Sequence, residues 1–588
     1  MYGSNRHSAP ATEKRRSSRI VIIESTGKRV LEQSRLRLAC VALVFLCSFC
    51  AIAVRLVDVS TRGLFDSSIN TLADYRATKP VHPRAEILDR NGEVLATTLR
   101  TASLYANPKL LREPVVIAEQ LKKALPDIDE KQIAKRLSSD RSFVWIKRHL
   151  TPKEQKIIND MGVPGLNFEP EYKRIYPQAN LFAHVLGYVD VDSKGMAGIE
   201  RGFEEFLRDE DGHAEPLKLS VDMRVQAILQ EELQASIKEF RAIGGAGVVM
   251  DITTGEVVAM TSLPDFDPHE PGKADADARF NRATMGVYEM GSTFKTFTMA
   301  VALESGVANM RSSYDATKPI RVARFTINDS HPENRWLTVP EIFAYSSNIG
   351  TVKMVMDVGS KRQQSFMKKL GMLDAVEMEI PEVADPLLPD PWREINTMTI
   401  SYGHGIAVTP VHLVRAIASI TGKGNLLPVT FVKDGNMGKP TGERILSEAN
   451  VVNVRKLLRL VVEHGTGSKS NAQGYRVGGK TGTAEKLGNG GGYKADSKMA
   501  SFVGVFPIDD PRYAVLVMVD EPKGTKKTWG YATGGWVSAP VVGNFVSRVG
   551  PLLGIRPIYE VPQQKSAKAK NNKSWVYYDG GAVHAISF

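Results

Sequence analysis

The longest uncharged apolar run of the chain lies near its N-terminus. Residues 38–54 (LACVALVFLCSFCAIAV) carry no charge, two arginines precede them closely, and Arg55 follows. Two more apolar residues beyond Arg55 lengthen the run to about the 20 residues that a membrane-spanning helix needs, because an arginine side chain near the end of such a helix reaches the membrane surface. The pattern predicts a single transmembrane helix over 38–57.

A cleaved signal peptide is the other interpretation of this run, since Ala51-Ile52-Ala53 resembles a cleavage site. The run is longer than the apolar core of a usual signal peptide and has no polar stretch before that site, which favours an uncleaved anchor. The positive charges lie upstream of the run, so they predict a cytoplasmic N-terminus with the rest of the chain outside.

Beyond the anchor, apolar runs separated by turn residues indicate β-hairpins. The segment 82–99 (HPRAEILDRNGEVLATTL) has its turn at Asp89-Arg90-Asn91-Gly92. Two apolar strands surround a Thr-Thr-Gly turn in 246–262, and a second pair in 500–522 turns at Asp509-Asp510-Pro511. Strands at both ends of a long segment with helices between them predict one antiparallel sheet covered by helices.

Helical periodicity begins just before the second hairpin. The segment LKLSVDMRVQAILQEELQASIKEF starts at Leu217 and reads as a strand followed by an amphipathic helix. Its predicted buried face consists of Val225, Ile228, Leu229, Leu233 and Ile237.

These patterns predict an α+β chain of five parts. A basic cytoplasmic tail and the anchor precede a pedestal domain that shows no catalytic pattern. An α+β domain with an antiparallel sheet and helices on both sides follows, and a polar tail, predicted to be disordered, ends the chain. The predicted boundaries are 1–37, 38–57, 58–215, 216–556 and 557–588.

The net charge of +11 belongs mainly to the two tails. Residues 1–37 carry nine Lys/Arg against three acids, and residues 557–588 carry four against two. Only +3 remains for the 519 residues between them. The folded part therefore does not have the basic surface that a nucleic-acid partner requires.

All three cysteines (Cys40, Cys47 and Cys50) lie inside the apolar run. None remains for a disulfide, a zinc site or a thiol nucleophile in the bulk of the chain. The sequence indicates no metal site and no organic cofactor.

A serine and a lysine stand one helical turn apart in YEMGSTFK, residues 288–295. Ser292 and Lys295 are i and i+3, so they share one helix face. A lysine that loses part of its solvation has a lowered pKa and can accept the proton of a serine hydroxyl. The pattern alone is weak, because Ser25–Lys28 and Ser365–Lys368 have the same spacing.

Two further motifs follow Ser292 along the chain. Ser346-Ser347-Asn348 begins 54 residues after it, and Lys480-Thr481-Gly482-Thr483 begins 134 residues after Ser346. The SxN pattern also occurs at Ser68–Asn70, but KTG occurs once. SxxK, SxN and KTG in this order are the signature of penicillin-binding proteins and serine β-lactamases.

With these motifs and their flanks, the chain resembles the class B penicillin-binding proteins, most closely the division type, the septal peptidoglycan D,D-transpeptidases. The resemblance runs from the anchor to about residue 555. It includes RAEILDRNG (84–92), RIYP (174–177), HVLGYVD (184–190), SYGHGIAVTP (401–410) and FVGVFPIDDPRYAVLVMVDEP (502–522). Ala85, Met290 and His412 stand where the family usually has Gly, Pro and Gln.

The resemblance implies a serine β-lactamase-like fold and a role for each motif residue. Ser292 would attack the carbonyl between the two terminal D-alanines of a stem peptide, and Lys295 would take the serine proton. Ser346 and Asn348 would relay protons and hold the substrate amide, with Lys480 polarising them. The last motif, Thr481, Gly482 and Thr483, would bind the substrate carboxylate and help to form the oxyanion hole.

The resemblance further implies β-lactams as inhibitors, a membrane-embedded septal glycan polymerase and other division proteins as partners, and a place in the bacterial inner membrane with the bulk of the chain periplasmic. Other functions stay open at this point. The same motifs occur in elongation-type transpeptidases and in hydrolases such as D,D-carboxypeptidases and β-lactamases. A division protein that acts mainly as a scaffold is a further alternative.

Overall fold

The computed structural model describes residues 26–65, 83–208, 215–322, 325–434, 444–487, 493–558, 575–579 and 582–586. The chain divides into two compact units, 1–81 and 82–588. The first 25 residues of the predicted basic tail and residues 559–574 of the predicted polar tail lie outside the described residues.

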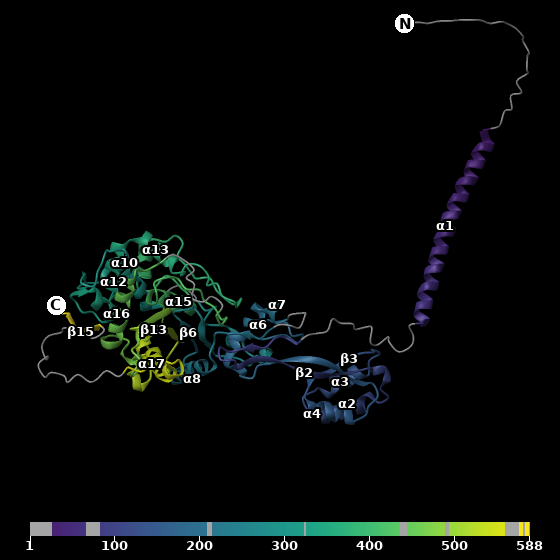
Figure 1. The fold of residues 1–588 in the computed structure, drawn as a ribbon, viewed down its shortest axis with the longest axis horizontal. Coiled ribbons are helices and arrows are strands. Elements are labelled where there is room, and N and C mark those ends of the chain that lie inside the picture. Colours follow the sequence, from purple (N-terminus) through teal and green to yellow (C-terminus); the bar gives the residue numbers. More distant parts are fainter. Residues whose placement is uncertain are drawn as a thin grey trace, which may run out of the picture. The chain divides into compact units, whose positions relative to one another are not determined.

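The N-terminal unit contains one long helix, α1 (Thr26–Phe65), drawn in purple in Figure 1. Its segment Ala39–Val57 is long and apolar enough to cross a membrane, and no other helix in the described part of the chain passes this test. The segment coincides with the predicted anchor over 38–57. Helical structure continues beyond both ends of the apolar run, where the flanking residues include many good helix formers.

A long strand, β2 (Val94–Ala106), organises the first part of the second unit (Figure 1). It pairs with three antiparallel strands, and a fifth strand adds in parallel to the first of them. These strands are β1 (Ile87–Leu88), β3 (Val144–Leu150), β4 (Leu166–Ile175) and β5 (Leu217–Lys218). The predicted hairpin in 82–99 is confirmed, and Gly92 in its turn has a φ of +93°.

The two halves of β2 contribute to different hydrophobic cores. Leu95 and Ala96 are fully buried in the main core of the unit, together with Leu219 from the segment that leads to the second sheet. Leu104 and Ala106 instead belong to a separate core. That second core is covered by α2 (Pro114–Ala124), α3 (Glu130–Leu137) and α4 (Pro152–Asp160). Short elements complete this part: η2 (Pro108–Leu110), η3 (Ala179–Phe182), α5 (Ala183–Leu186), α6 (Gly198–Gly202) and α7 (Glu204–Leu207).

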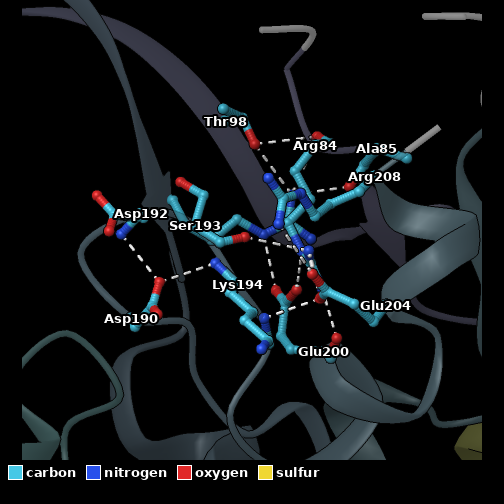
Figure 2. A network of polar contacts seen from close by, with 12 residues as sticks. Arg84, Ala85, Thr98, Asp190, Asp192, Ser193, Lys194, Glu200, Glu204 and Arg208 are labelled. Atoms are coloured by element: carbon cyan, nitrogen blue, oxygen red, sulfur yellow. Dashed lines mark hydrogen bonds and ion pairs between the residues drawn. The ribbon is translucent and has the colours of Figure 1, made fainter. Parts of the chain in front are cut away.

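A buried ionic network joins three distant segments of this part (Figure 2). Arg84 Nε donates to Glu200 Oε2 at 2.5 Å, and Arg174 Nε donates to Glu200 Oε1 at 2.7 Å. The side chains of these three residues are at most 2% exposed. Arg84 also pairs with Glu204 at 2.8 Å. The network therefore fixes the start of the unit and the end of β4 to α6.

The second sheet is antiparallel and has the order β12-β13-β14-β6-β7. Its strands are β6 (Gly244–Asp251), β7 (Val257–Leu263), β12 (Gly478–Leu487), β13 (Tyr493–Phe506) and β14 (Tyr513–Asp520). The β6–β7 and β13–β14 pairs confirm the two predicted hairpins in 246–262 and 500–522. Within this sheet β12 lies at one edge.

Helices cover both faces of this sheet, as the α+β prediction requires. Neighbouring residues of β6 face opposite sides: Val248 lies in the main core and Val249 in the core formed with α8 and α17. The helices are α8 (Met223–Glu239) and α17 (Gly534–Leu552) on one side, and α10 (Lys295–Glu304), α15 (Pro410–Thr421) and α16 (Glu448–His464) on the other. In α8, Val225, Leu229 and Leu233 are fully buried, as the sequence predicts.

The remaining elements of this part are short. They are η4 (Pro271–Lys273), α9 (Ala276–Arg279), η5 (Gly291–Phe294), β8 (Ser313–Asp315), β9 (Ile320–Val322), β10 (Phe325–Ile327), β11 (Trp336–Thr338), α11 (Val339–Ala344), α12 (Asn348–Val358), α13 (Ser360–Lys369), α14 (Glu394–Ile400), η6 (Ser468–Ser470) and η7 (Lys526–Thr528). Near the C-terminus, β15 (Trp575–Asp579) pairs with β16 (Ala582–Ile586), an element that the sequence analysis does not predict.

Candidate active site

The serine of the first motif lies in a tight turn between the sheet and a buried helix. Ser292 belongs to the 3₁₀ turn η5, which leads directly into α10. Gly291 before it has a φ of +54°, and a Cβ at this position would lie 2.7 Å from Thr483 O. A glycine is therefore needed here, both for the backbone conformation and for the close approach of β12. Ser292 itself is partly exposed.

Lys295, the first residue of α10, is fully buried beneath this serine. Its Nζ lies 3.1 Å from Ser292 Oγ and 3.0 Å from Ser346 Oγ. It donates to Ser346 O at 2.6 Å and to Asn348 Oδ1 at 2.6 Å. The structure thus brings the SxxK and SxN motifs together around one amine.

The four contacts of Lys295 indicate which way its lone pair would point. Ser346 O and Asn348 Oδ1 can only accept, so they use two N–H bonds of the amine. The two hydroxyls, of Ser292 and Ser346, can each donate as well as accept. A neutral Lys295 has two N–H bonds and one lone pair, and its lone pair would therefore face the hydroxyls.

Burial lowers the pKa of Lys295 well below its usual value, and the positive charge of Lys480 lowers it further. The carboxylate of Asp329 acts in the opposite direction. Burial also lowers the pKa of Lys480, to about 7. Two buried amines that share one serine thus disfavour double protonation, which makes a neutral Lys295 accessible near neutral pH.

Ser346 connects the two lysines. Its Oγ accepts a hydrogen bond from Lys480 Nζ at 3.1 Å, and the same atom lies 3.0 Å from Lys295 Nζ. Ser346 stands between α11 and α12 with a φ of +59°, a conformation that is uncommon for a non-glycine residue. Lys480 Nζ lies 5.8 Å from the centre of the Phe343 ring, which helps to hold the second amine.

The third motif runs along β12, the edge strand. Gly482 has no room for a Cβ, which would lie 2.5 Å from Met290 O. The strand can therefore pack directly against the turn that carries the serine. Thr481 Oγ1 lies 2.7 Å from Thr466 Oγ1, and Thr483 Oγ1 accepts from the backbone N–H of Gly534 at 3.1 Å. Each of the two threonine hydroxyls thus has a hydrogen-bond partner from another segment.

All eight residues that the sequence analysis singles out lie in or against this cluster. The competing Ser365–Lys368 pair lies on α13, with both residues exposed and no place in the cluster. Ser25 and Ser68, which begin the other matching patterns, lie outside the described residues.

Three residues that support the cluster are not predicted by the motifs. Asp329 accepts hydrogen bonds from the start of α12, and Thr466 contacts Thr481. Gly403 packs beneath the serine turn, where its Cβ would lie 1.9 Å from Gly291 O. The SYGHG sequence around Gly403 was a possible signal for this contact. Asp329 and Thr466 carry no local pattern.

His404, next to Gly403, is buried near the same cluster. Burial lowers its pKa to about 4, and the charge of Lys295 contributes. A histidine with so low a pKa is neutral at physiological pH. This agrees with a packing or hydrogen-bonding role for His404.

Comparisons with known proteins cover both parts of the second unit. Residues 80–231 match the family model "Penicillin-binding Protein dimerisation domain", and residues 245–547 match "Penicillin binding protein transpeptidase domain". The chain is 38% identical over 483 residues to "Probable peptidoglycan D,D-transpeptidase FtsI" of Caulobacter vibrioides, covering 80% of this chain and 82% of that relative. It is 30% identical over 507 residues to "Peptidoglycan D,D-transpeptidase FtsI" of Escherichia coli, covering 81% and 84%.

A solved structure has the same fold. It is a peptidoglycan synthetase from Bifidobacterium adolescentis, with a TM-score of 0.63 and 22% identity. The match covers 82% of this chain and 97% of that one.

Proposed function

The chain belongs to the class B penicillin-binding proteins, and we propose that it is a division-type peptidoglycan D,D-transpeptidase that works through an acyl-enzyme on Ser292. The observation that carries the proposal is the contact of one buried amine, Lys295 Nζ, with Ser292, Ser346 and Asn348 at 2.6–3.1 Å. This is the arrangement in which a serine hydroxyl can lose its proton as it attacks a carbonyl.

In the first half of the reaction, neutral Lys295 takes the proton of Ser292 as Oγ attacks the carbonyl carbon between the two terminal D-alanines of a stem peptide. The tetrahedral oxyanion forms beside the backbone of Ser292 and Thr483, whose N–H groups act as its donors. Such a donor contributes about 2.7–4 kcal/mol of transition-state stabilisation in comparable enzymes. The C–N bond then breaks, and the leaving D-alanine amine receives a proton relayed through Ser346.

In the second half, the amine of a neighbouring stem peptide attacks the ester carbonyl. It loses a proton to the same relay, the C–O bond breaks, and Ser292 regains its proton. Lys480 contributes positive charge to the relay, and Thr481 and Thr483 hold the carboxylate of the donor peptide. β-Lactams mimic that donor peptide and stop at the ester.

The remaining parts of the proposal concern place and organisation. The helix segment Ala39–Val57 anchors the chain in the inner membrane, with the N-terminus cytoplasmic because the positive charges precede it. The proposed division into a pedestal over 58–215 and a catalytic part over 216–556 gives the pedestal the role of binding a septal glycan polymerase and other division proteins. Orientation and partners are tested by protease accessibility in spheroplasts and by cross-linking in cells.

The reaction is tested with the full chain in detergent, using a fluorescent penicillin and intact-mass spectrometry. A long-lived adduct that is absent in Ser292→Ala is expected, together with cross-linked product from stem peptides. Ser365→Ala is the matched control, because it removes the serine of the other described SxxK pair and should label normally.

Rapid release of hydrolysed penicillin would instead indicate a β-lactamase or carboxypeptidase, in which water reaches the ester. If the fluorescent penicillin did not label the native chain, a scaffolding role in division would be favoured. The elongation type would be favoured if depletion of the protein blocked side-wall growth and not septation.

Gly403→Ala is predicted to lower the rate of acylation about a hundredfold, because a Cβ placed 1.9 Å from Gly291 O must displace the turn that carries Ser292. Gly306→Ala is the control. Gly306 also has a positive φ, of +72°, but a Cβ there meets nothing within 4 Å. It should cost about 1 kcal/mol of stability and leave acylation unchanged. Equal acylation rates in the two variants would contradict the prediction.

A further inference from the structure

Asp329 lies in the loop between β10 and β11, 17 residues before Ser346, and contacts none of the reacting groups directly. Its Oδ1 accepts from the backbone N–H groups of Asn348 at 2.5 Å and Ile349 at 3.0 Å. Its Oδ2 accepts from Ser347 Oγ at 2.7 Å. One carboxylate thus holds three donors at the start of α12.

Asn348, which donates the shortest of these three hydrogen bonds to Asp329, is also the residue that contacts the amine of Lys295. Asn348 Oδ1 accepts from Lys295 Nζ at 2.6 Å, and Asn348 Nδ2 donates to Asn328 O at 2.8 Å. The loop that carries Asp329 therefore fixes Asn348 from both its backbone and its side chain. A shift of this loop would move Asn348 Oδ1 away from Lys295.

The charge of Asp329 matters as well as its hydrogen bonds. Lys295 is faced by Lys480 from β12, by Asp329 from this loop and by neutral His404 from the loop after α14. Asp329 raises the pKa of Lys295, against burial and Lys480, which lower it. Removing the negative charge should therefore leave Lys295 neutral down to a lower pH.

We infer that Asp329 is a positioning residue of the acylation site, which fixes Asn348 against Lys295 and balances the charge of the two buried lysines. The inference rests on the proposed function, because it assigns Asp329 a part in the same acylation. Asp329 itself exchanges no proton or bond with the substrate.

Two variants separate the hydrogen bonds from the charge. Asp329→Asn keeps an oxygen that accepts from Asn348 and Ile349, and its amide can donate to Ser347 Oγ, so only the charge is lost. Asp329→Ala loses both. Asp315→Asn is the matched control, since Asp315 also accepts from a backbone N–H and a hydroxyl and pairs with Lys353 on α12 at 3.3 Å.

The experiment measures the second-order rate of acylation by a fluorescent penicillin from about pH 5 to about pH 9, and the thermal midpoint, for the full chain in detergent. Asp329→Asn should keep its maximal rate within about threefold, with the acid limb of the profile moved to lower pH. Asp329→Ala should lose about tenfold to a hundredfold of its maximal rate, the size expected when hydrogen bonds to a charged group are removed, and its acid limb should move to lower pH as in Asp329→Asn. Asp315→Asn should match the native chain.

The inference would be overturned if the acid limb of Asp329→Asn stayed where it is in the native chain. It would also be overturned if the acylation rate of both variants fell only in proportion to a fall in their thermal midpoints, because that would indicate a general loss of stability. If the native chain labels through Ser292 and Asp329→Asn shows the native profile, only the inference falls. If the native chain does not label, the proposed function fails and the inference fails with it.

Discussion

Replacing Lys295 by methionine is expected to lower the rate of acylation at least about a thousandfold while the chain stays folded. The buried amine is the group in contact with Ser292 Oγ that can accept its proton, and methionine has no basic atom. Methionine fills a similar volume, and an apolar side chain at a fully buried position avoids the cost of burying an amine. The thermal midpoint should therefore not fall in parallel with the rate.

The measurement is the second-order rate of labelling by a fluorescent penicillin, with the thermal midpoint of the same preparation. Lys368→Met is the matched control, because Lys368 is the exposed lysine of the other described SxxK pair. It should label at the native rate. A Lys295→Met protein that keeps more than about a tenth of the native rate would exclude Lys295 as the base and point to another group.

Glu200→Gln is expected to lower the free energy of unfolding by about 3–5 kcal/mol, more than any other substitution proposed above. Glutamine has nearly the same shape, but it leaves the buried guanidinium of Arg174 without a negative partner and Arg84 with Glu204 alone. The side chains of Glu200 and Arg174 are 0% and 1% exposed, so water cannot replace the lost charge.

Urea unfolding of the full chain in detergent measures this loss. Glu231→Gln is the control, since Glu231 pairs with Arg548 at 2.7 Å but is 67% exposed on its side chain. An exposed pair of this kind contributes about 0–1 kcal/mol. If the two variants unfold at the same urea concentration, the network does not stabilise the unit in the way described.

The sequence points to the residues of the candidate cluster because its motifs are local patterns. Ser292 and Lys295 are one helical turn apart, and the KTG motif occurs once. The hairpins are also predicted, since Asp-Asp-Pro and Thr-Thr-Gly turns between apolar runs leave few alternatives. The contact between Lys295 and Ser346, in contrast, has no local pattern that would predict it. It joins residues 51 apart and depends on the fold, so only the family resemblance suggests it.

The residues that the sequence does not reveal act through long-range contacts. Thr466 and Asp329 can be recognised as supporting residues only once the fold is known. The fold places Thr466 beside Thr481 and Asp329 beside the start of α12. An aspartate in NDSHPENR looks like any polar loop residue, because its three hydrogen-bond donors come from residues 18 to 20 positions later. The C-terminal hairpin is missed for another reason: its strands follow a long polar stretch, which suggests a segment without structure.

The two cores that share β2 affect how such proteins could exchange parts by recombination. Leu95 and Ala96 pack in the same core as Leu219 and Val221, so a hybrid gene joined at residue 216 would combine strands from one parent with a core shaped by the other. A replacement of a segment that lies wholly within 107–165 would instead change buried apolar residues of the separate core around Leu104 and none of the main core. The helices that cover the far end of β2 could therefore be exchanged between parents without repacking the core that the first half of β2 shares with the second sheet.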